Sequence, residues 1–179
     1  AKSVIALKEL WPEAKVGASF AYSPSYAIDN KPENAMAKAD YDDLKNYYWM
    51  DVYAYGRYPR AALAYLEANG VAPVFEEGDN AIMKEAAQLV DFMGVNYYQT
   101  TTVEFNDIDG VGTSHEMNTT GKKGTAKVQG VPGLYKNPQN ANLPTTDWDW
   151  TIDPMGIRMC CREITSRYDL PIVISENGL

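Results

Sequence analysis

Three stretches of the 179-residue sequence are apolar enough to form buried strands, and each ends in polar or aromatic side chains. They span residues 15–24, 91–105 and 171–177, and helical patterns separate them. Continuously apolar strands that alternate with helices indicate a parallel sheet covered by helices. We therefore predict an α/β fold with about three parallel strands and covering helices.

Apolar residues three or four positions apart predict the helices between these strands. The predicted helices span residues 3–11, 32–55, 59–69, 79–90 and 153–169. Residues 106–147 are instead rich in Gly, Asn, Thr, Lys and Pro and have little periodicity. This composition predicts a long loop without regular structure, and loops of that length are usually functional or mobile.

Charge and composition exclude several classes of partner. The net charge of −8 with no basic block argues against nucleic acid, because phosphate binding needs clustered Lys and Arg. No apolar run approaches the roughly 18 to 20 residues of a membrane helix, and the first residues do not match a signal peptide. Cys160 and Cys161 are adjacent, which disfavours a disulfide between them. Reduced thiols fit a cytoplasmic location.

The carboxyl ends of the predicted strands are the first place to look for a site, because parallel α/β folds bind ligands there. Glu176 follows the third strand, where a rigidly held carboxylate can act as nucleophile, general base or metal ligand. A surface glutamate just past a strand is the simple alternative. Asn177 could orient a substrate hydroxyl, although Asn-Gly is also a common turn pair.

Aromatic side chains accompany these polar groups. Asn96 and Tyr98 end the second strand and share one side of it, with Tyr97 on the other. A phenol beside a carboxylate can hydrogen-bond it and fix its orientation, although packing beneath helices is equally common. Trp148 and Trp150 flank a single aspartate before the last helix. An indole there can stack on a sugar ring or anchor a loop.

Metal and cofactor chemistry has little support in the sequence. His115 is the only histidine, which argues against a zinc site and several histidine-based triads. No Gly-x-Ser-x-Gly elbow is present, and the loop glycines do not follow strands as phosphate-binding loops do. We therefore expect no cofactor and no metal. The 13 tyrosines and 4 tryptophans suit either a Tyr-rich core or a sugar-binding cleft.

Four segments coincide, in order, with motifs of a known family. Residues 172–179, IVISENGL, resemble the nucleophile motif of glycoside hydrolase family one. Residues 91–105, DFMGVNYYQTTTVEF, resemble the sixth barrel strand of that family, and residues 47–59 and 150–158 are similar to other segments of it. Within the family, the chain most resembles the bacterial 6-phospho-β-glucosidases in three segments, GVNYYQTTTVEFN, DWDWTIDP and ITSRYDLP. The resemblance covers the whole chain.

The resemblance implies a TIM (β/α)8 barrel, a fold that typically takes about 250 residues. Residues 1–179 are expected to supply a single segment of that barrel, from the fourth helix to the seventh strand. The chain is therefore expected to be a fragment of a larger enzyme and inactive alone. The outer edges of a three-stranded sheet would also favour self-association.

The resemblance further implies a retaining mechanism that cleaves 6-phospho-β-D-glucosides in the bacterial cytoplasm. Glu176 would be the nucleophile, and Tyr98 would hydrogen-bond it and hold its orientation. Asn96, Trp150 and Asn177 would bind a small sugar or sugar phosphate. The family's acid/base glutamate lies in an Asn-Glu-Pro motif, which is absent from these 179 residues. The Ser, Lys and Tyr that hold the phosphate in the family's phosphoglucosidases are likewise not found.

Other functions remain open on the sequence. A 6-phospho-β-galactosidase or an unphosphorylated β-glucosidase of the same family would carry the same motifs. A non-enzymatic carbohydrate-binding or structural fragment would keep the aromatic contacts without turnover. A complete small α/β protein that converged on Glu-Asn-Gly is disfavoured by four motifs in the right order.

Overall fold

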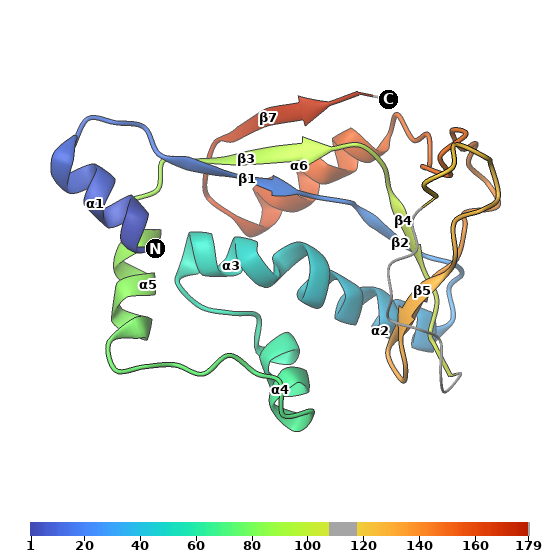
Figure 1. The fold of residues 1–179 in the computed structure, drawn as a ribbon, viewed down its shortest axis with the longest axis horizontal. Coiled ribbons are helices and arrows are strands. Elements are labelled where there is room, and N and C mark those ends of the chain that lie inside the picture. The colour runs from blue at the N-terminus through green and yellow to red at the C-terminus, as the bar shows by residue number, and fades with distance from the viewer. Residues whose placement is uncertain (108–117, 179) are drawn as a thin grey trace. The chain divides into compact units, whose positions relative to one another are not determined.

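The largest sheet has three strands in the order β1-β3-β7, formed by β1 (Gly17–Ala21), β3 (Phe92–Tyr97) and β7 (Ile172–Asn177). The computed structural model describes residues 1–107 and 118–178. β1 and β3 pair in parallel. The arrows of all three strands point the same way in Figure 1. The α/β fold with a parallel sheet, predicted from the apolar strands, is therefore confirmed.

The chain forms two compact units. The first comprises Ala1–Ala21, Asp43–Asn96 and Cys161–Glu176, and the second comprises Tyr22–Asp42, Tyr97–Cys160 and Asn177–Leu179. The three-stranded sheet belongs almost entirely to the first unit, and the shorter strands belong to the second.

Helices pack on the sheet and on one another in the first unit. They are α1 (Lys2–Leu10), α3 (Tyr47–Tyr55), α4 (Arg60–Ala68), α5 (Asp79–Ala87) and most of α6 (Gly156–Arg167). α5 packs against both α1 and α3. Gly56 ends α3 with a φ of 65°, and a Cβ there would lie 2.5 Å from Lys84 Cα on α5. Glycine therefore permits both the end of α3 and the close approach of α5.

One face of the sheet is buried beneath α3. Met93 and Val95 point to this face and are fully buried. Phe20, which lies opposite Val95, packs edge-on against Tyr53 of α3 with ring centroids 5.3 Å apart. The Tyr53 hydroxyl donates a 2.8 Å hydrogen bond to the Phe92 carbonyl oxygen. The tyrosine thus contributes apolar area to the core while its polar atom is satisfied by the strand backbone.

A partly buried ion pair connects α3 with the end of α6. The Asp51 carboxylate is 4% exposed and accepts two hydrogen bonds from the Arg167 guanidinium, at 2.8 and 2.6 Å. Tyr168 donates to the same carboxylate at 2.7 Å, and the guanidinium lies 4.0 Å from the centre of the Tyr47 ring. Bidentate geometry and the additional donor compensate the cost of burying the Asp51 carboxylate.

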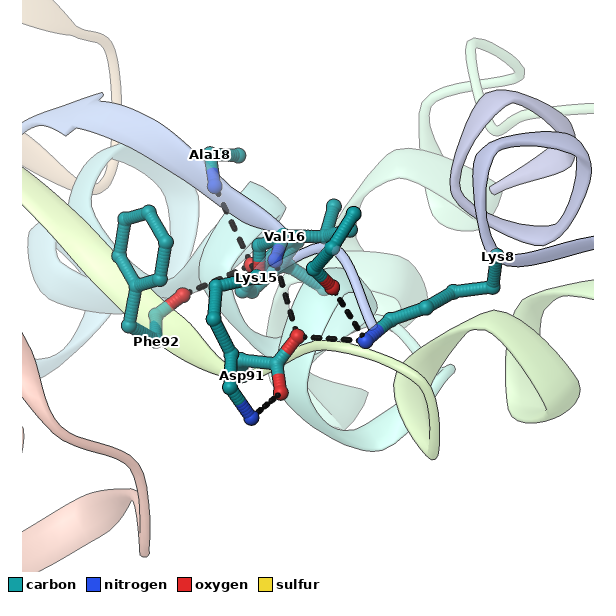
Figure 2. A network of polar contacts seen from close by, with 8 residues as sticks. Lys8, Lys15, Val16, Ala18, Asp91 and Phe92 are labelled. Atoms are coloured by element: carbon teal, nitrogen blue, oxygen red, sulfur yellow. Dashed lines mark hydrogen bonds and ion pairs between the residues drawn. The ribbon is translucent and has the colours of Figure 1, made fainter. Parts of the chain in front are cut away.

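A polar network fixes the start of β1 beside the start of β3. Figure 2 shows the Asp91 carboxylate between the ammonium groups of Lys8 and Lys15, at 2.7 and 2.9 Å. It also accepts the Val16 backbone N–H at 2.9 Å. Three donors, one from α1 and two from the residues just before β1, therefore converge on one carboxylate at the amino ends of both strands.

The second unit is built around two short strand pairs. β2 (Ser25–Ala27) pairs in parallel with β4 (Thr101–Val103), and β5 (Gln129–Val131) pairs antiparallel with β6 (Tyr135–Asn137). The helix α2 (Pro32–Tyr41) contacts β2, β4 and β6. Tyr41 and Tyr135 are both buried, with ring centroids 5.2 Å apart in an edge-to-face arrangement. These two of the 13 tyrosines therefore belong to the hydrophobic core.

Two predicted strands and one predicted helix are interrupted. The strand predicted over 15–24 ends at Ala21, and the strand predicted over 91–105 is divided into β3 and β4. The Ser23 hydroxyl donates to the Gln99 carbonyl oxygen at 3.0 Å, which satisfies the backbone where both strands break off. The predicted helix over 32–55 holds a π-helical turn, η1 (Asp42–Asn46), between α2 and α3.

The prediction that residues 106–147 lack regular structure was wrong, because β5 and β6 lie within them. Gly133 has a φ of 76°, which suits the turn of this hairpin. Leu134 donates its backbone N–H to the Val131 carbonyl oxygen at 3.1 Å. Strands of three residues are too short to produce a detectable hydrophobic period.

We expect Asp91→Asn to destabilise the full-length protein at neutral pH and to flatten its response to acid. Hydrogen bonds from Lys8, Val16 and Lys15 hold the pKa of Asp91 well below its usual range. A lowered folded-state pKa stabilises the fold above the unfolded pKa of about 4, and that stability is lost as the pH falls through the folded pKa. Urea midpoints measured from about pH 7 down to about pH 3 test this dependence.

The matched control is Asp169→Asn, which changes an exposed aspartate of the same unit. This variant is expected to keep the acid dependence of the wild type. An unchanged pH slope in Asp91→Asn would show that the network does not stabilise the fold.

Candidate functional site

The carboxyl ends of β1, β3 and β7 carry a cluster of polar side chains in the first unit. Asn96 Oδ1 accepts hydrogen bonds from Ser19 Oγ at 2.6 Å and from Ser175 Oγ at 2.8 Å. The two serine oxygens are themselves 2.7 Å apart. Three contacts share two hydroxyl protons, so only two of them can be hydrogen bonds at one time. The Asn96 amide is thereby oriented, with its oxygen toward the serines.

Glu176 is the penultimate residue of β7, so the sheet fixes its backbone as the sequence predicts. Its side chain is exposed in this structure. The sheet therefore fixes the backbone from which the carboxylate extends.

Asn177 ends β7 and has a structural contact that the sequence did not predict. Its Nδ2 donates a 3.0 Å hydrogen bond to the Tyr97 carbonyl oxygen at the end of β3. The side-chain amide therefore replaces a backbone donor where the ladder of the sheet stops. The predicted contact with substrate would be made by the Oδ1 atom.

Tyr98 and Trp150 come together in the second unit. Their ring centroids are 5.7 Å apart and their planes are inclined by 59°. Tyr98 directly follows β3, and Trp150 lies on the segment that leads into α6. Of the predicted site residues, Glu176 and Asn96 belong to the first unit, and Tyr98, Trp150 and Asn177 belong to the second.

Asp153 organises the segment that carries Trp150. Its Oδ2 accepts the hydroxyl protons of Tyr26 at 2.9 Å and Thr100 at 3.1 Å. Its Oδ1 accepts the backbone N–H groups of Met155 at 3.0 Å and Gly156 at 3.2 Å, which caps the start of α6. The helix predicted over 153–169 is therefore present, but it begins at Gly156, three residues after this aspartate.

Tyr97 is buried against the same segment. Its hydroxyl donates a 2.6 Å hydrogen bond to the Asp153 carbonyl oxygen. Burial, followed by the charge of Asp153, raises the pKa of Tyr97 above its ordinary value. A Cβ on Gly156 would lie 1.9 Å from the Tyr97 hydroxyl oxygen, so only glycine fits at that position. Tyr97 is thus a structural residue, and Tyr98 is its neighbour on the opposite side of the chain.

A cavity of about 290 Å³ opens beside Trp150 in the second unit. Its lining combines two indoles with hydroxyl and amide side chains. Among these residues are Ser23, Gln99, Gln129, Asn137, Trp148 and Trp150. The sequence pattern indicates the two tryptophans but not the polar groups, which come from segments distant in the chain.

A metal centre is not found in the described residues. Across 1–107 and 118–178, no three His, Cys, Asp or Glu side chains are arranged to hold an ion. His115, singled out as the only histidine, lies outside the described residues.

Comparisons with known proteins agree on one family. The model of glycosyl hydrolase family 1 matches residues 1–179. An aryl-phospho-β-D-glucosidase of Bacillus subtilis is 47% identical over the whole chain, which covers 37% of that protein. The 6-phospho-β-galactosidase 1 of Streptococcus pneumoniae strain TIGR4 is 35% identical over 99% of the chain, which covers 38% of it.

Solved structures show the same fold. The β-glucosidase of Exiguobacterium antarcticum B7 superposes with a TM-score of 0.75 at 25% identity, and the match covers 99% of this chain and 35% of that one. A family 1 β-glucosidase of Thermotoga maritima superposes with a TM-score of 0.73 at 23% identity, covering 99% and 34%. The chain thus spans little more than a third of the relatives' length and forms part of their barrel.

Replacing Asp153 with alanine should lower the stability of the full-length protein by about 2 to 3 kcal/mol, because the change leaves buried hydroxyl donors unpaired and removes a helix cap. The shift of the urea unfolding midpoint measures this loss. Asp147→Ala is the control, since it changes an exposed aspartate on the same segment. Equal midpoints for the two variants would contradict the organising role of Asp153.

Proposed function

Because the chain belongs to glycosyl hydrolase family 1, we propose that it is part of a retaining β-glycosidase that cleaves 6-phospho-β-D-glucosides. The observation that carries this proposal is the 47% identity, over the entire chain, to a protein named as an aryl-phospho-β-D-glucosidase. The chain covers 37% of that relative, so the activity is proposed for a longer protein that contains these residues. Within it, residues 1–179 would run from the fourth helix to the seventh strand of the barrel.

The proposed reaction uses two carboxylates, which lie about 5 to 5.5 Å apart in retaining glycosidases. Glu176 attacks the anomeric carbon and displaces the leaving group, giving a glycosyl-enzyme. A second carboxylic acid protonates the leaving oxygen and then, as a carboxylate, takes a proton from the water that hydrolyses the intermediate. The 179 residues contain no Asn-Glu-Pro, so another part of the protein would supply this acid.

The remaining site residues would bind and orient. Tyr98 would donate a hydrogen bond to the Glu176 carboxylate, keeping it ionised and directed at the sugar. With its Oδ1 engaged by Ser19 and Ser175, Asn96 would offer its Nδ2 to a sugar hydroxyl. Trp150 would contact the leaving group. Asn177 would contribute its Oδ1 while its Nδ2 is bonded to the backbone.

Two related substrates are the alternatives within the family. The first alternative is a 6-phospho-β-galactoside, which the 35% identity to a 6-phospho-β-galactosidase favours. The second is an unphosphorylated glucoside, which the likeness to β-glucosidase structures favours. The test is to compare the rates at which the full-length protein hydrolyses an aryl 6-phospho-β-glucoside, an aryl 6-phospho-β-galactoside and an aryl β-glucoside. The substrate with the highest rate identifies the specificity. A non-enzymatic carbohydrate-binding protein would bind a sugar but hydrolyse none of them.

We propose a cytoplasmic location. Cys160 and Cys161 are not joined in a disulfide, as a reducing compartment would allow. In the described portion of the chain, no helix has the length and apolar character needed to cross a bilayer. The relatives named above come from bacteria, which fits the predicted origin.

Glu176→Gln should reduce hydrolysis of p-nitrophenyl 6-phospho-β-D-glucoside by the full-length protein by roughly 10⁴-fold or more, because an amide cannot form the glycosyl-enzyme. The rate of p-nitrophenolate release measures the effect. Glu67→Gln, on the exposed face of α4, is the matched control and should keep wild-type activity. Substantial turnover by Glu176→Gln would exclude Glu176 as the nucleophile.

The 179-residue chain produced alone should self-associate. β1 and β7 are the outer strands of the described three-stranded sheet, and Val173 and Ile174 of β7 are 46% and 38% exposed. Exposed apolar strands at a sheet edge pair with other chains. Light scattering coupled to gel filtration should detect dimers or larger species, which Val173→Lys should reduce. A monomer at all concentrations would contradict this expectation.

A further inference from the structure

At the carboxyl ends of the three strands, the residues that share a face of the sheet with Asn96 are small. Alternation along β3 places Asn96, with Gly94, on the face turned away from α3. Across the strand pair, Ala21 lies opposite Asn96 and Ser19 lies opposite Gly94. Ser175 of β7 reaches the same place, since a Cβ on Gly94 would lie 3.3 Å from its hydroxyl oxygen. Glycine, alanine and serine offer little surface against which the Asn96 amide could pack.

Hydrogen bonds supply the orientation that packing does not. Asn96 Oδ1 accepts the Ser19 hydroxyl at 2.6 Å and the Ser175 hydroxyl at 2.8 Å. The two hydroxyl oxygens are 2.7 Å apart, so the three oxygens form a closed triangle that holds two protons. Both protons reach Oδ1 directly, or one serine donates to the other, which then donates to Oδ1. Within the triangle, at least one hydroxyl therefore always donates to the Asn96 oxygen.

Because the serines hold the oxygen of the Asn96 amide, its nitrogen points away from them. The two N–H groups of this nitrogen can only donate hydrogen bonds, whereas an amide turned by 180° would present an oxygen that can only accept them. The two orientations have nearly the same shape, so hydrogen-bond partners select between them. The serine pair therefore determines that Asn96 meets a ligand as a donor.

The triangle also makes the two serines partly redundant. Without the Ser19 hydroxyl, Ser175 still donates to Asn96 Oδ1, and without the Ser175 hydroxyl, Ser19 does so. Only the loss of both hydroxyls removes both of these donors from the amide oxygen. Two residues that replace one another in this way give a double variant whose loss exceeds the sum of the single losses, whereas independent residues give additive losses.

We propose that Ser19 and Ser175 are a pair of positioning residues that hold Asn96 as a hydrogen-bond donor to one hydroxyl of the sugar that Glu176 attacks. The serines act through Asn96 and need not touch the substrate. The inference rests on the proposed function, in which Asn96 binds a sugar hydroxyl. It deepens that function by identifying the groups that keep the amide in its binding orientation before the substrate arrives.

The test measures kcat/KM of the full-length protein and of Ser19→Ala, Ser175→Ala, the double variant and Asn96→Ala. The substrates are p-nitrophenyl 6-phospho-β-D-glucoside and its 2-deoxy, 3-deoxy and 4-deoxy analogues. Asn96→Ala identifies the hydroxyl concerned, because its loss relative to the wild type should be smallest on the analogue that lacks this hydroxyl. The control is the double variant Ser3→Ala/Ser166→Ala, which removes two exposed hydroxyls of the same unit.

We expect the double variant of Ser19 and Ser175 to lose about fivefold in kcat/KM on the parent substrate, since binding must then order a free side chain. Each single variant should lose less than about twofold, because one hydroxyl still holds the amide. On the analogue that Asn96→Ala identifies, the double variant should also lose less than about twofold, because the hydroxyl that needs the donor is absent. The control variant should match the wild type on all four substrates.

Four results would overturn the inference. An equal loss by the double variant on all four substrates would mean that the serines act only on folding. Additive losses in the single variants would mean that the two hydroxyls act separately, and an active double variant would mean that they orient nothing. An equal loss by Asn96→Ala on all four substrates would mean that Asn96 binds none of these hydroxyls.

Neutron diffraction from crystals of the deuterated full-length protein tests the orientation without a substrate, because neutrons distinguish nitrogen from oxygen. The inference predicts that Oδ1 of Asn96 faces Ser19 and Ser175. If the wild type hydrolyses none of the four substrates, the proposed function fails, and this measurement still decides how the serines orient the amide. An Nδ2 atom that faces the serines would overturn the inference even in an active enzyme.

Discussion

The close approach of three strands at Gly94 is the constraint on which the first unit depends. A Cβ at this position would lie 3.0 Å from the Ala18 carbonyl oxygen and 3.3 Å from Ser175 Oγ, so any larger residue would require β1 or β7 to shift by a few tenths of an ångström. Two residues later, Asn96 meets Ser19 and Ser175. The buried opposite face, with Met93 and Val95, fixes the register that brings these polar groups together.

Two aspartates have a comparable role in the second unit. Asp153 accepts hydroxyl and backbone donors and fixes the start of α6, while Asp149 accepts donors from residues 118–126 and fixes the loop that precedes it. Trp150 lies between these two anchored points. An aromatic side chain supported from both sides loses little further entropy when a ligand binds, which is what a preorganised binding wall requires.

The sequence was sufficient for the elements that bury continuous apolar surface. β1, β3 and β7 were predicted because their apolar runs are long enough to recognise, and the order of motifs identified the family. The strands β2, β4, β5 and β6 have three residues each and were missed or merged, because their pairing depends on contacts with α2 and on the turn at Gly133. No local sequence pattern predicts such contacts.

The candidate site was predictable to a similar extent. Glu176, Asn96, Tyr98 and Trp150 carry recognisable chemistry at strand or helix ends, so sequence identified them, and their roles remain predictions. Ser19 and Ser175 gave little signal, because a serine inside an apolar strand is ordinary. Asp149 gave none, since its contacts depend on a left-handed backbone and on donors 23 to 31 residues away. Such roles arise only from the folded arrangement.

In the proposed mechanism, Glu176 forms a covalent bond to the sugar in the full-length enzyme. The most direct measurement is to react that protein with a 2-deoxy-2-fluoro-6-phospho-β-D-glucosyl fluoride and to locate the label by peptide mass spectrometry. The proposed mechanism predicts one stoichiometric label, on Glu176 in the segment IVISEN. A label on a different residue, or an enzyme that hydrolyses 6-phospho-β-glucosides yet never acquires a label, would contradict it.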